Sequence, residues 1–349
     1  LTGLRPLPEV LAADANQPEF TRQVWAYLDG AVSPARVARG RELLGLHRPL
    51  FDAMERRYGV PGEIVAAIWA MESNYGTNVG SIPVVRALAT LAHTGRRTGY
   101  GREQLIAALQ IIDRGDVAPE RMIGSWAGAM GQTQFIPTTY RQFAVDADAD
   151  GRRDLWHSLP DIFASTANYL ATSGWRRGVP WGAEVFLPAG FDLELADTSV
   201  VEPVARWRAL GIRILPGTVL AQDEPASLLL PAGHQGPAFL VTNSFRAILR
   251  YNNSTSYALA VGHLSDRLRG MGPIEAAWPR HLRALSRDER TELQHLLSAR
   301  GYEPGTPDGI VGPMTRAALR RYQTDEGLPA DGFATSELLE RLRRDSALS

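Results

Sequence analysis

Hydrophobic residues recur at helical spacing along most of the first 175 residues. The clearest stripe joins Val65, Ile68 and Trp69 to Glu72, behind a proline and an acidic residue that suit a first helical turn. Gly76 is a plausible end for this helix. The same spacing predicts further helices in this part of the chain at residues 33–58, 84–93, 103–113 and 159–173.

The pattern changes after residue 175. Between residues 181 and 245, proline and glycine interrupt short hydrophobic runs, which predicts short strands with turns or a partly irregular insert. A helix is predicted again at 256–269, followed by a linker at 273–284. We therefore expect a mainly α region over residues 1–272 that carries a small β-containing insert. The predicted strands lie at 184–187, 212–215 and 239–241.

Residues 285–345 have a rhythm of their own. Helices are predicted at 288–299, 313–326 and 335–343, and they alternate with the turns Asp308-Gly309 and Asp331-Gly332. This alternation indicates a weak internal repeat. A unit of about sixty residues folds alone, if only marginally, so we expect a separate three-helix module.

Composition and charge exclude several classes of protein. The 37 basic and 38 acidic residues give a formal net charge of −1, which offers no electrostatic basis for binding nucleic acid. The absence of cysteine excludes disulfides, thiolate nucleophiles and cysteine-bound zinc. The longest apolar run, residues 64–71, is far shorter than the ~20 residues of a transmembrane helix. No secretory signal is visible, and a mature or truncated chain would have lost any export signal or lipid anchor.

Glu72 is the first candidate for chemistry. It shares the helix face of Ile68 and Trp69, where removal from water disfavours the carboxylate and raises the pKa of the carboxyl. An acid that is still protonated near neutral pH suits a general acid in glycoside cleavage. The alternative is that the helix ends here and Glu72 turns into solvent.

Three sequence motifs bear on this choice. Residues 70–76, Ala-Met-Glu-Ser-Asn-Tyr-Gly, resemble the ESxYG signature of lytic transglycosylases. Residues 124–137 resemble the second motif of these enzymes, GxAGAMGxxQFxP, and Asn168-Tyr169 matches a third. Together they resemble the membrane-bound lytic transglycosylase B family, including its soluble relatives, over roughly residues 20–270.

The resemblance implies a fold and a reaction. The fold is a lysozyme-like helical domain with a deep glycan groove, and the reaction is cleavage of the β-1,4 bond between N-acetylmuramic acid and N-acetylglucosamine in peptidoglycan. Glu72 would protonate the bridging oxygen and then take the proton of the C6 hydroxyl, which closes a 1,6-anhydro ring. The acetamido group and C6 hydroxyl of the sugar would replace the second carboxylate and the water of ordinary glycosidases. No cofactor would be needed for catalysis.

Two other functions remain open. A lysozyme-type hydrolase would need a second placed carboxylate or a held water molecule, and a non-catalytic wall-binding scaffold would bind glycan without turnover. The resemblance also implies residues that contact the substrate, some of them aromatic residues that could equally be core residues. They are Ser125, Met130, Gln134, Tyr169, Tyr251, Asn252, Tyr257, Arg96, Arg97 and Tyr27. Met130 would form an apolar wall, and Arg96 and Arg97 would suit lactyl or peptide carboxylates.

An acidic segment indicates a cation site. It matches the front half of an EF-hand loop, with oxygen ligands at positions 1, 3, 5 and 9 and glycine at position 6. The matching residues are Asp146, Asp148, Asp150, Gly151 and Asp154. The carbonyl of Arg152 would be a further ligand, but His157 at position 12 is a poor ligand for calcium.

The resemblance bears on this loop as well. Some members of the family bind calcium or sodium in an extended loop that a later aspartate closes, which implies Asp161 here, in a loop that is one residue longer. The expected role is structural. A solvated acidic turn is the alternative.

Residues 285–345 resemble the peptidoglycan-binding domain type 1. This resemblance implies that the module holds the enzyme on its polymer and raises its effective concentration there. The expected partners are glycan strands and muropeptides, with other cell-wall enzymes as further candidates. We expect a monomer in the periplasm.

Overall fold

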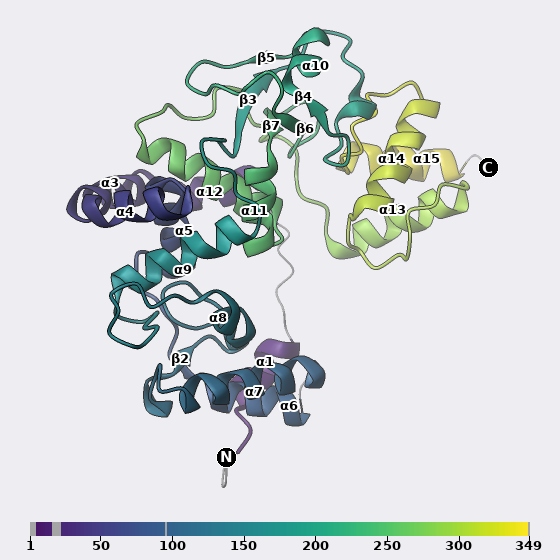
Figure 1. Cartoon of the computed structure of the whole chain (residues 1–349). Coiled ribbons are helices and arrows are strands. Elements are labelled where there is room, and N and C mark those ends of the chain that lie inside the picture. Colours follow the sequence, from purple (N-terminus) through teal and green to yellow (C-terminus); the bar gives the residue numbers. More distant parts are fainter. Residues whose placement is uncertain (1–4, 16–21, 95, 348–349) are drawn as a thin grey trace.

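The computed structural model describes residues 5–15, 22–94 and 96–347. A helical body surrounds helix α5, which is buried along almost its whole length. Phe51, Trp69 and Phe163 pack together in its core. The helices of this body are α2 (Val24–Ala31), α3 (Pro34–Leu46), α4 (Arg48–Tyr58), α5 (Gly62–Ser73), α9 (Leu159–Thr172), α11 (Asn243–Tyr251) and α12 (Thr255–Leu268) (Figure 1).

A second lobe lies below this body in Figure 1 and has its own hydrophobic core, which includes Leu88 and Met122. Ile82 pairs with Gly124, so β1 and β2 form an antiparallel pair at its upper edge. The lobe contains α1 (Pro8–Ala15), β1 (Ile82–Pro83), α6 (Val84–Thr94), α7 (Thr98–Asp113), the 3-10 helix η1 (Pro119–Arg121), β2 (Ile123–Gly124) and α8 (Pro137–Phe143).

A five-stranded antiparallel sheet covers the other side of the body, in the order β4-β6-β7-β3-β5. In its register Glu184 lies opposite Phe239, and Leu228 lies opposite Leu240. Trp207 is fully buried in a separate core that includes Leu228 and Leu240 of the sheet. The elements are β3 (Gly182–Phe186), η2 (Leu193–Leu195), β4 (Glu202–Pro203), α10 (Val204–Ala209), β5 (Arg213–Ile214), β6 (Pro225–Leu229) and β7 (Ala238–Val241).

The last three helices, α13 (Arg287–Ala299), α14 (Pro313–Asp325) and α15 (Ser336–Ala347), form a separate module with its own core. The Gln294 side chain donates to the Asp308 carboxylate and accepts from the N–H of Gly309. Gln323 makes the same two bonds with the turn at residues 331–332. The internal repeat indicated by the sequence is therefore a repeated glutamine-to-turn clamp.

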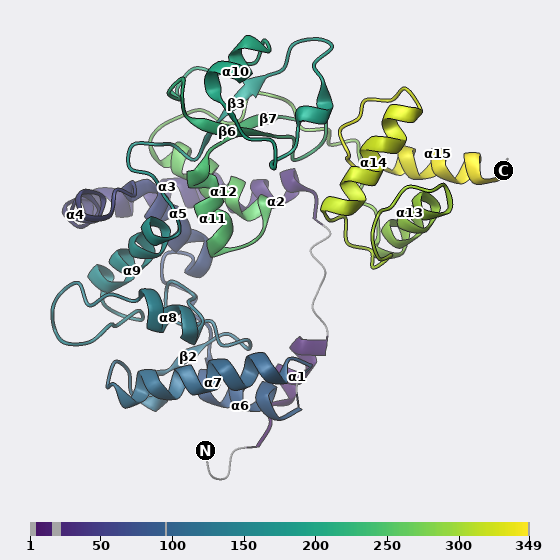
Figure 2. The same cartoon turned by 45° about the vertical axis from the view of Figure 1, so that its right-hand side comes forward.

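The C-terminal module docks beside the sheet (Figure 2). Both the N–H and the ring Nδ1 of His234 lie within hydrogen-bond distance of Asp331 Oδ2, at 2.9 and 2.6 Å. Arg320 of α14 bonds Asp197 at 2.6 Å, ahead of β4. A small hydrophobic cluster lies between the module and the body and consists of Trp25, Ala232, Leu282, Trp278 and Phe333.

The structure confirms a mainly α fold with a small sheet and a three-helix module, and it corrects some elements. The helix predicted at 33–58 is two helices that meet at His47, because Pro49 is accommodated in the first turn of a helix but not in its interior. Helix α5 ends at Ser73, three residues before Gly76. Strand β6 and helix α11 were not predicted.

Candidate active site

Glu72 lies in the last turn of α5, directly before a sharp reversal of the chain. Asn74, Tyr75 and Gly76 follow with φ angles of 49°, 58° and 81°, so three consecutive residues are in the left-handed region. Only glycine adopts this region without strain, and strained backbone clusters at functional sites. The Ser73 hydroxyl accepts the N–H of Gly76 and donates to the Trp69 carbonyl, which ties the reversal back onto the helix.

The Glu72 side chain is partly buried, and among the described residues one hydroxyl group donates a hydrogen bond to its carboxyl. Burial raises its pKa to about 7, although the Tyr257 hydroxyl, which donates to Oε1 at 2.5 Å, acts in the opposite direction. Within the described residues, no second Asp or Glu is among the groups that shift this pKa. The carboxyl can therefore be protonated or ionised near neutral pH.

Tyrosines from three helices gather around this carboxyl. Burial raises the pKa of Tyr27, Tyr251 and Tyr257, and the negative charge of Glu72 adds to the effect on each. Tyr251 donates to the Thr133 carbonyl at 2.7 Å, and its ring meets that of Tyr169 edge-on at 4.9 Å. These neutral phenols keep the carboxyl away from other charges.

The loop of residues 123–135 carries three of the predicted substrate residues, and most of their polar atoms bond within the loop. Ser125 Oγ accepts the N–H of Ala129 at 3.0 Å. The Gln134 amide donates to the Gly131 carbonyl at 2.9 Å, and Gln134 itself has a φ of 51°. Met130 is fully buried in the core of the second lobe, and its role as a wall toward substrate stays a prediction.

The remaining predicted substrate residues lie in different surroundings. The backbone N–H of Arg96 and the guanidinium of Arg97 both bond the Asp14 carboxylate of α1. Arg97 also stacks over the Trp126 ring at 5.2 Å, so its guanidinium is already engaged. Asn252 is exposed just after α11 and next to Tyr251.

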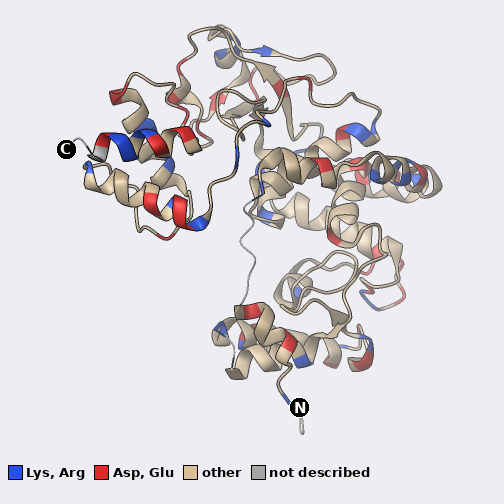
Figure 3. Cartoon of the chain, turned by 180° about the vertical axis from the view of Figure 1, so that it is seen from behind, with Lys and Arg blue, Asp and Glu red and all other residues tan. Residues whose placement is uncertain are grey.

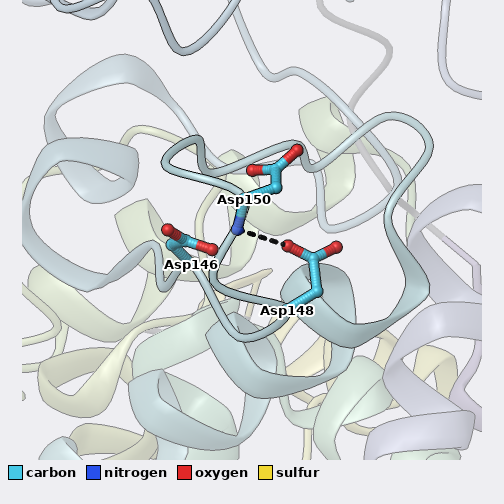
Figure 4. A group of neighbouring side chains, drawn as sticks. All are labelled: Asp146, Asp148 and Asp150. Atoms are coloured by element: carbon cyan, nitrogen blue, oxygen red, sulfur yellow. Dashed lines mark hydrogen bonds between the residues drawn. The ribbon is translucent and has the colours of Figure 1, made fainter.

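The predicted cation loop brings three carboxylates together. Asp146, Asp148 and Asp150 each place one oxygen within 4.8 Å of the others (Figure 4). Asp146 Oδ1 is buried and has no hydrogen-bond partner, which is compatible with an oxygen that ligates a cation. Gly151 has a φ of 90°, as the sharp turn of an EF-hand-like loop requires. Arg152 is exposed and donates its N–H to Asp150.

Asp161 does not join this cluster. It is fully buried, and its two oxygens accept the N–H groups of Ala147 and Asp154 at 2.7 and 2.8 Å. In this structure Asp161 therefore organises the backbone of the loop, and its role as the closing ligand, which the resemblance implies, stays a prediction.

Charge and hydropathy add little to the site. Basic and acidic positions are interspersed along the chain in Figure 3, including on the C-terminal helices. Among the described residues, no helix has the length and apolar character needed to cross a membrane.

Comparison with known proteins places these features in context. The family described as transglycosylase SLT domain matches residues 1–266, and the family described as putative peptidoglycan binding domain matches residues 286–342. Membrane-bound lytic murein transglycosylase B of Escherichia coli is 32% identical over 242 residues. That alignment covers 67% of this chain and spans only 64% of the length of this curated relative.

Solved structures give a similar result. The crystal structure of SltB3 from Pseudomonas aeruginosa in complex with NAG-anhNAM-pentapeptide is 54% identical, with a TM-score of 0.94, over 98% of this chain and 92% of the other. The Escherichia coli lytic transglycosylase Slt35 in complex with calcium is 30% identical, with a TM-score of 0.65, over 76% of this chain and 84% of the other.

Proposed function

The chain belongs to the transglycosylase SLT domain family, and we propose that it is a lytic transglycosylase that cleaves the glycan strands of peptidoglycan. The observation that carries the proposal is Glu72. This single carboxyl has a pKa raised to about 7 by burial, has a tyrosine donor, and has no acidic partner among the described groups that act on it. The relative solved with NAG-anhNAM-pentapeptide supports an anhydromuramoyl product.

Glu72 acts twice in the proposed reaction. Its proton passes to the oxygen that bridges N-acetylmuramic acid to N-acetylglucosamine, and the bond from C1 to that oxygen breaks. The carboxylate then takes the proton of the C6 hydroxyl, whose oxygen bonds C1 and closes the 1,6-anhydro ring. The acid is thereby restored, and no water is consumed. A pKa near the working pH suits a group that must first give a proton and then take one.

A hydrolase of the lysozyme type is the competing function. It needs a second carboxylate, as nucleophile or base, some 5 to 10 Å from the acid. Among the described residues, the groups that act on the Glu72 carboxyl include no such acid. Transglycosylation needs only the one carboxyl, so it is the function that this arrangement favours.

The test is a digestion of purified sacculi with the products identified by mass spectrometry. The natural protein is compared with Glu72→Gln and with a control, Glu42→Gln, which changes an exposed glutamate on α3. We expect anhydromuramoyl products, one water lighter than hydrolytic ones, from the natural protein and the control, and none from Glu72→Gln. Reducing-end muramoyl products would instead identify a hydrolase. Binding without any cleavage by the natural protein would identify a scaffold.

We further propose that the loop of Asp146, Asp148 and Asp150 holds a structural calcium ion. The carboxylate cluster and the buried, unpartnered Asp146 Oδ1 support this, as does the relative that was solved with calcium. Oxygen ligands of this kind suit calcium. The loop leads into α9, which carries Tyr169, so the ion would stabilise the support of the site and would take no part in the reaction.

The C-terminal module, in this proposal, holds the enzyme on its polymer as a periplasmic monomer. The match to a putative peptidoglycan binding domain supports the first part. Because His234 and Arg320 tie the module to the sheet, binding of one part to the wall would keep the other part nearby. Sedimentation of the purified protein tests the monomer, and fractionation of cells tests the compartment.

A further inference from the structure

Gln132 connects three segments of the protein through one side chain. Its Oε1 accepts the indole N–H of Trp69, on α5, at 2.7 Å. Its Nε2 donates to the Trp156 carbonyl at 2.7 Å, and its own backbone N–H donates to the Leu155 carbonyl at 2.7 Å. The catalytic helix, the loop of residues 123–135 and the segment before α9 are thus joined at one carboxamide.

On the helix side, this carboxamide lies against the chain reversal that follows Glu72. Trp69 is one turn before Glu72 and only 5% exposed, and its ring meets Tyr75 edge-on at 5.4 Å. A Cβ atom on Gly76 would lie 2.3 Å from Gln132 Oε1, so the glycine makes room for the carboxamide. The position of Gln132 is therefore coupled to the backbone that presents Glu72.

On the other side, Gln132 fixes the loop that carries Ser125 and Gln134. A Cβ atom on Gly131 would lie 2.6 Å from the Leu155 carbonyl, which shows how closely the loop approaches the segment before α9. The Trp156 indole N–H donates to the Ile123 carbonyl at 2.9 Å and so holds the far end of the same loop.

We propose that Gln132 is a positioning residue that sets the distance between the Glu72 carboxyl and the loop of residues 123–135. This inference rests on the proposed function and deepens it. Both polar atoms of the carboxamide already bond groups of the protein, so Gln132 acts on the reaction through its neighbours and not by direct contact with the sugar. The residue controls how well a bound glycan is aligned for proton transfer.

The test separates turnover from binding. Gln132→Met keeps the length of the side chain and removes both hydrogen bonds, and kcat and KM are measured on soluble glycan strands released from sacculi. We expect kcat to fall roughly 10- to 100-fold, since a misplacement of about 1 Å can cost 100-fold. KM should change less than about threefold. The pH at which activity falls on the alkaline side should not change, because the pKa of Glu72 sets it. The matched control is Gln110→Met, at an exposed position of α7.

A second variant keeps the test decisive if Gln132→Met does not fold. Trp69→Phe retains a ring against Tyr75 and removes the indole donor together with part of the ring, so it should also lower kcat. Where both variants fold, their effects on kcat in the double variant should be less than multiplicative, because both break the same bond. An unchanged kcat in folded Gln132→Met, or a raised KM with unchanged kcat, would overturn the proposal. Absence of anhydro products from the natural protein would instead be a failure of the proposed function.

Discussion

Glu72 should destabilise the folded protein at alkaline pH, and Glu72→Gln should remove that cost. Burial raises the pKa of this carboxyl from its ordinary value of 4.5 to about 7. A raised pKa favours folding below the unfolded value, and the benefit is lost as the pH rises through the folded value. This difference in pKa lowers the free energy of unfolding by about 3 kcal/mol above pH 7 and by less than about 1 kcal/mol at pH 5. An amide has no charge to bury, and its oxygen can still accept the Tyr257 hydroxyl.

Urea unfolding of the natural protein and the variant at pH 5 and pH 8 measures this effect. From pH 5 to pH 8, the free energy of unfolding of Glu72→Gln should rise by roughly 2–3 kcal/mol relative to that of the natural protein. For Glu42→Gln, at an exposed glutamate of α3, the difference from the natural protein should be the same at both pH values. An equal difference between natural protein and Glu72→Gln at both pH values would mean that the carboxyl is not buried from water, and the argument for a raised pKa would be lost.

Three further predictions follow from the contacts of the site. Tyr257→Phe removes the donor that lowers the pKa of Glu72, so the loss of activity at alkaline pH should move above pH 7, as a pH–rate profile will show. Calcium at 100 times its Kd should stabilise the natural protein by about 2.7 kcal/mol, which is measured as a rise in Tm. Asp146→Asn should abolish this rise, and the control Asp52→Asn should retain it. His234→Ala removes the bond between the imidazole ring and Asp331 and leaves the backbone N–H bond in place, so tryptic cleavage within residues 273–284 should be faster at least severalfold. Slower or unchanged cleavage would show that the hydrophobic cluster and the remaining bonds hold the module without the ring.

Helical periodicity was a good guide to the elements that build the body. The stripe of Val65, Ile68 and Trp69 predicted both helix α5 and the burial of the carboxyl on the same face, since these are local consequences of spacing. The break at His47 could have been read from Pro49. Strand β6 was missed because its pairing with β7 depends on contacts made through the sheet, which no local pattern encodes.

The surroundings of the carboxyl were harder to predict. Tyr257 lies 185 residues after Glu72, so only the family resemblance pointed to it before the fold placed its hydroxyl beside the acid. Gln132 was missed because the second motif accepts any residue at its position. Only the glycine at position 76 hinted that another group lies close to the chain reversal. Met130 and Asp161, which the resemblance assigned to substrate and cation, are buried in this structure, and their assigned roles stay predictions.

The reversal after α5 explains why so many features of the site converge on one short segment. A carboxyl that gives a proton and then takes one must stay at nearly the same place in both charge states, because the described groups that act on it include no second acid. Three consecutive left-handed residues fix the backbone just beyond it, at a cost of strain that the surrounding contacts must offset. Tyr257 fixes the carboxyl itself, and Gln132 fixes the loop opposite. Rigid placement by neutral donors takes the place of the second carboxylate that a hydrolase would use.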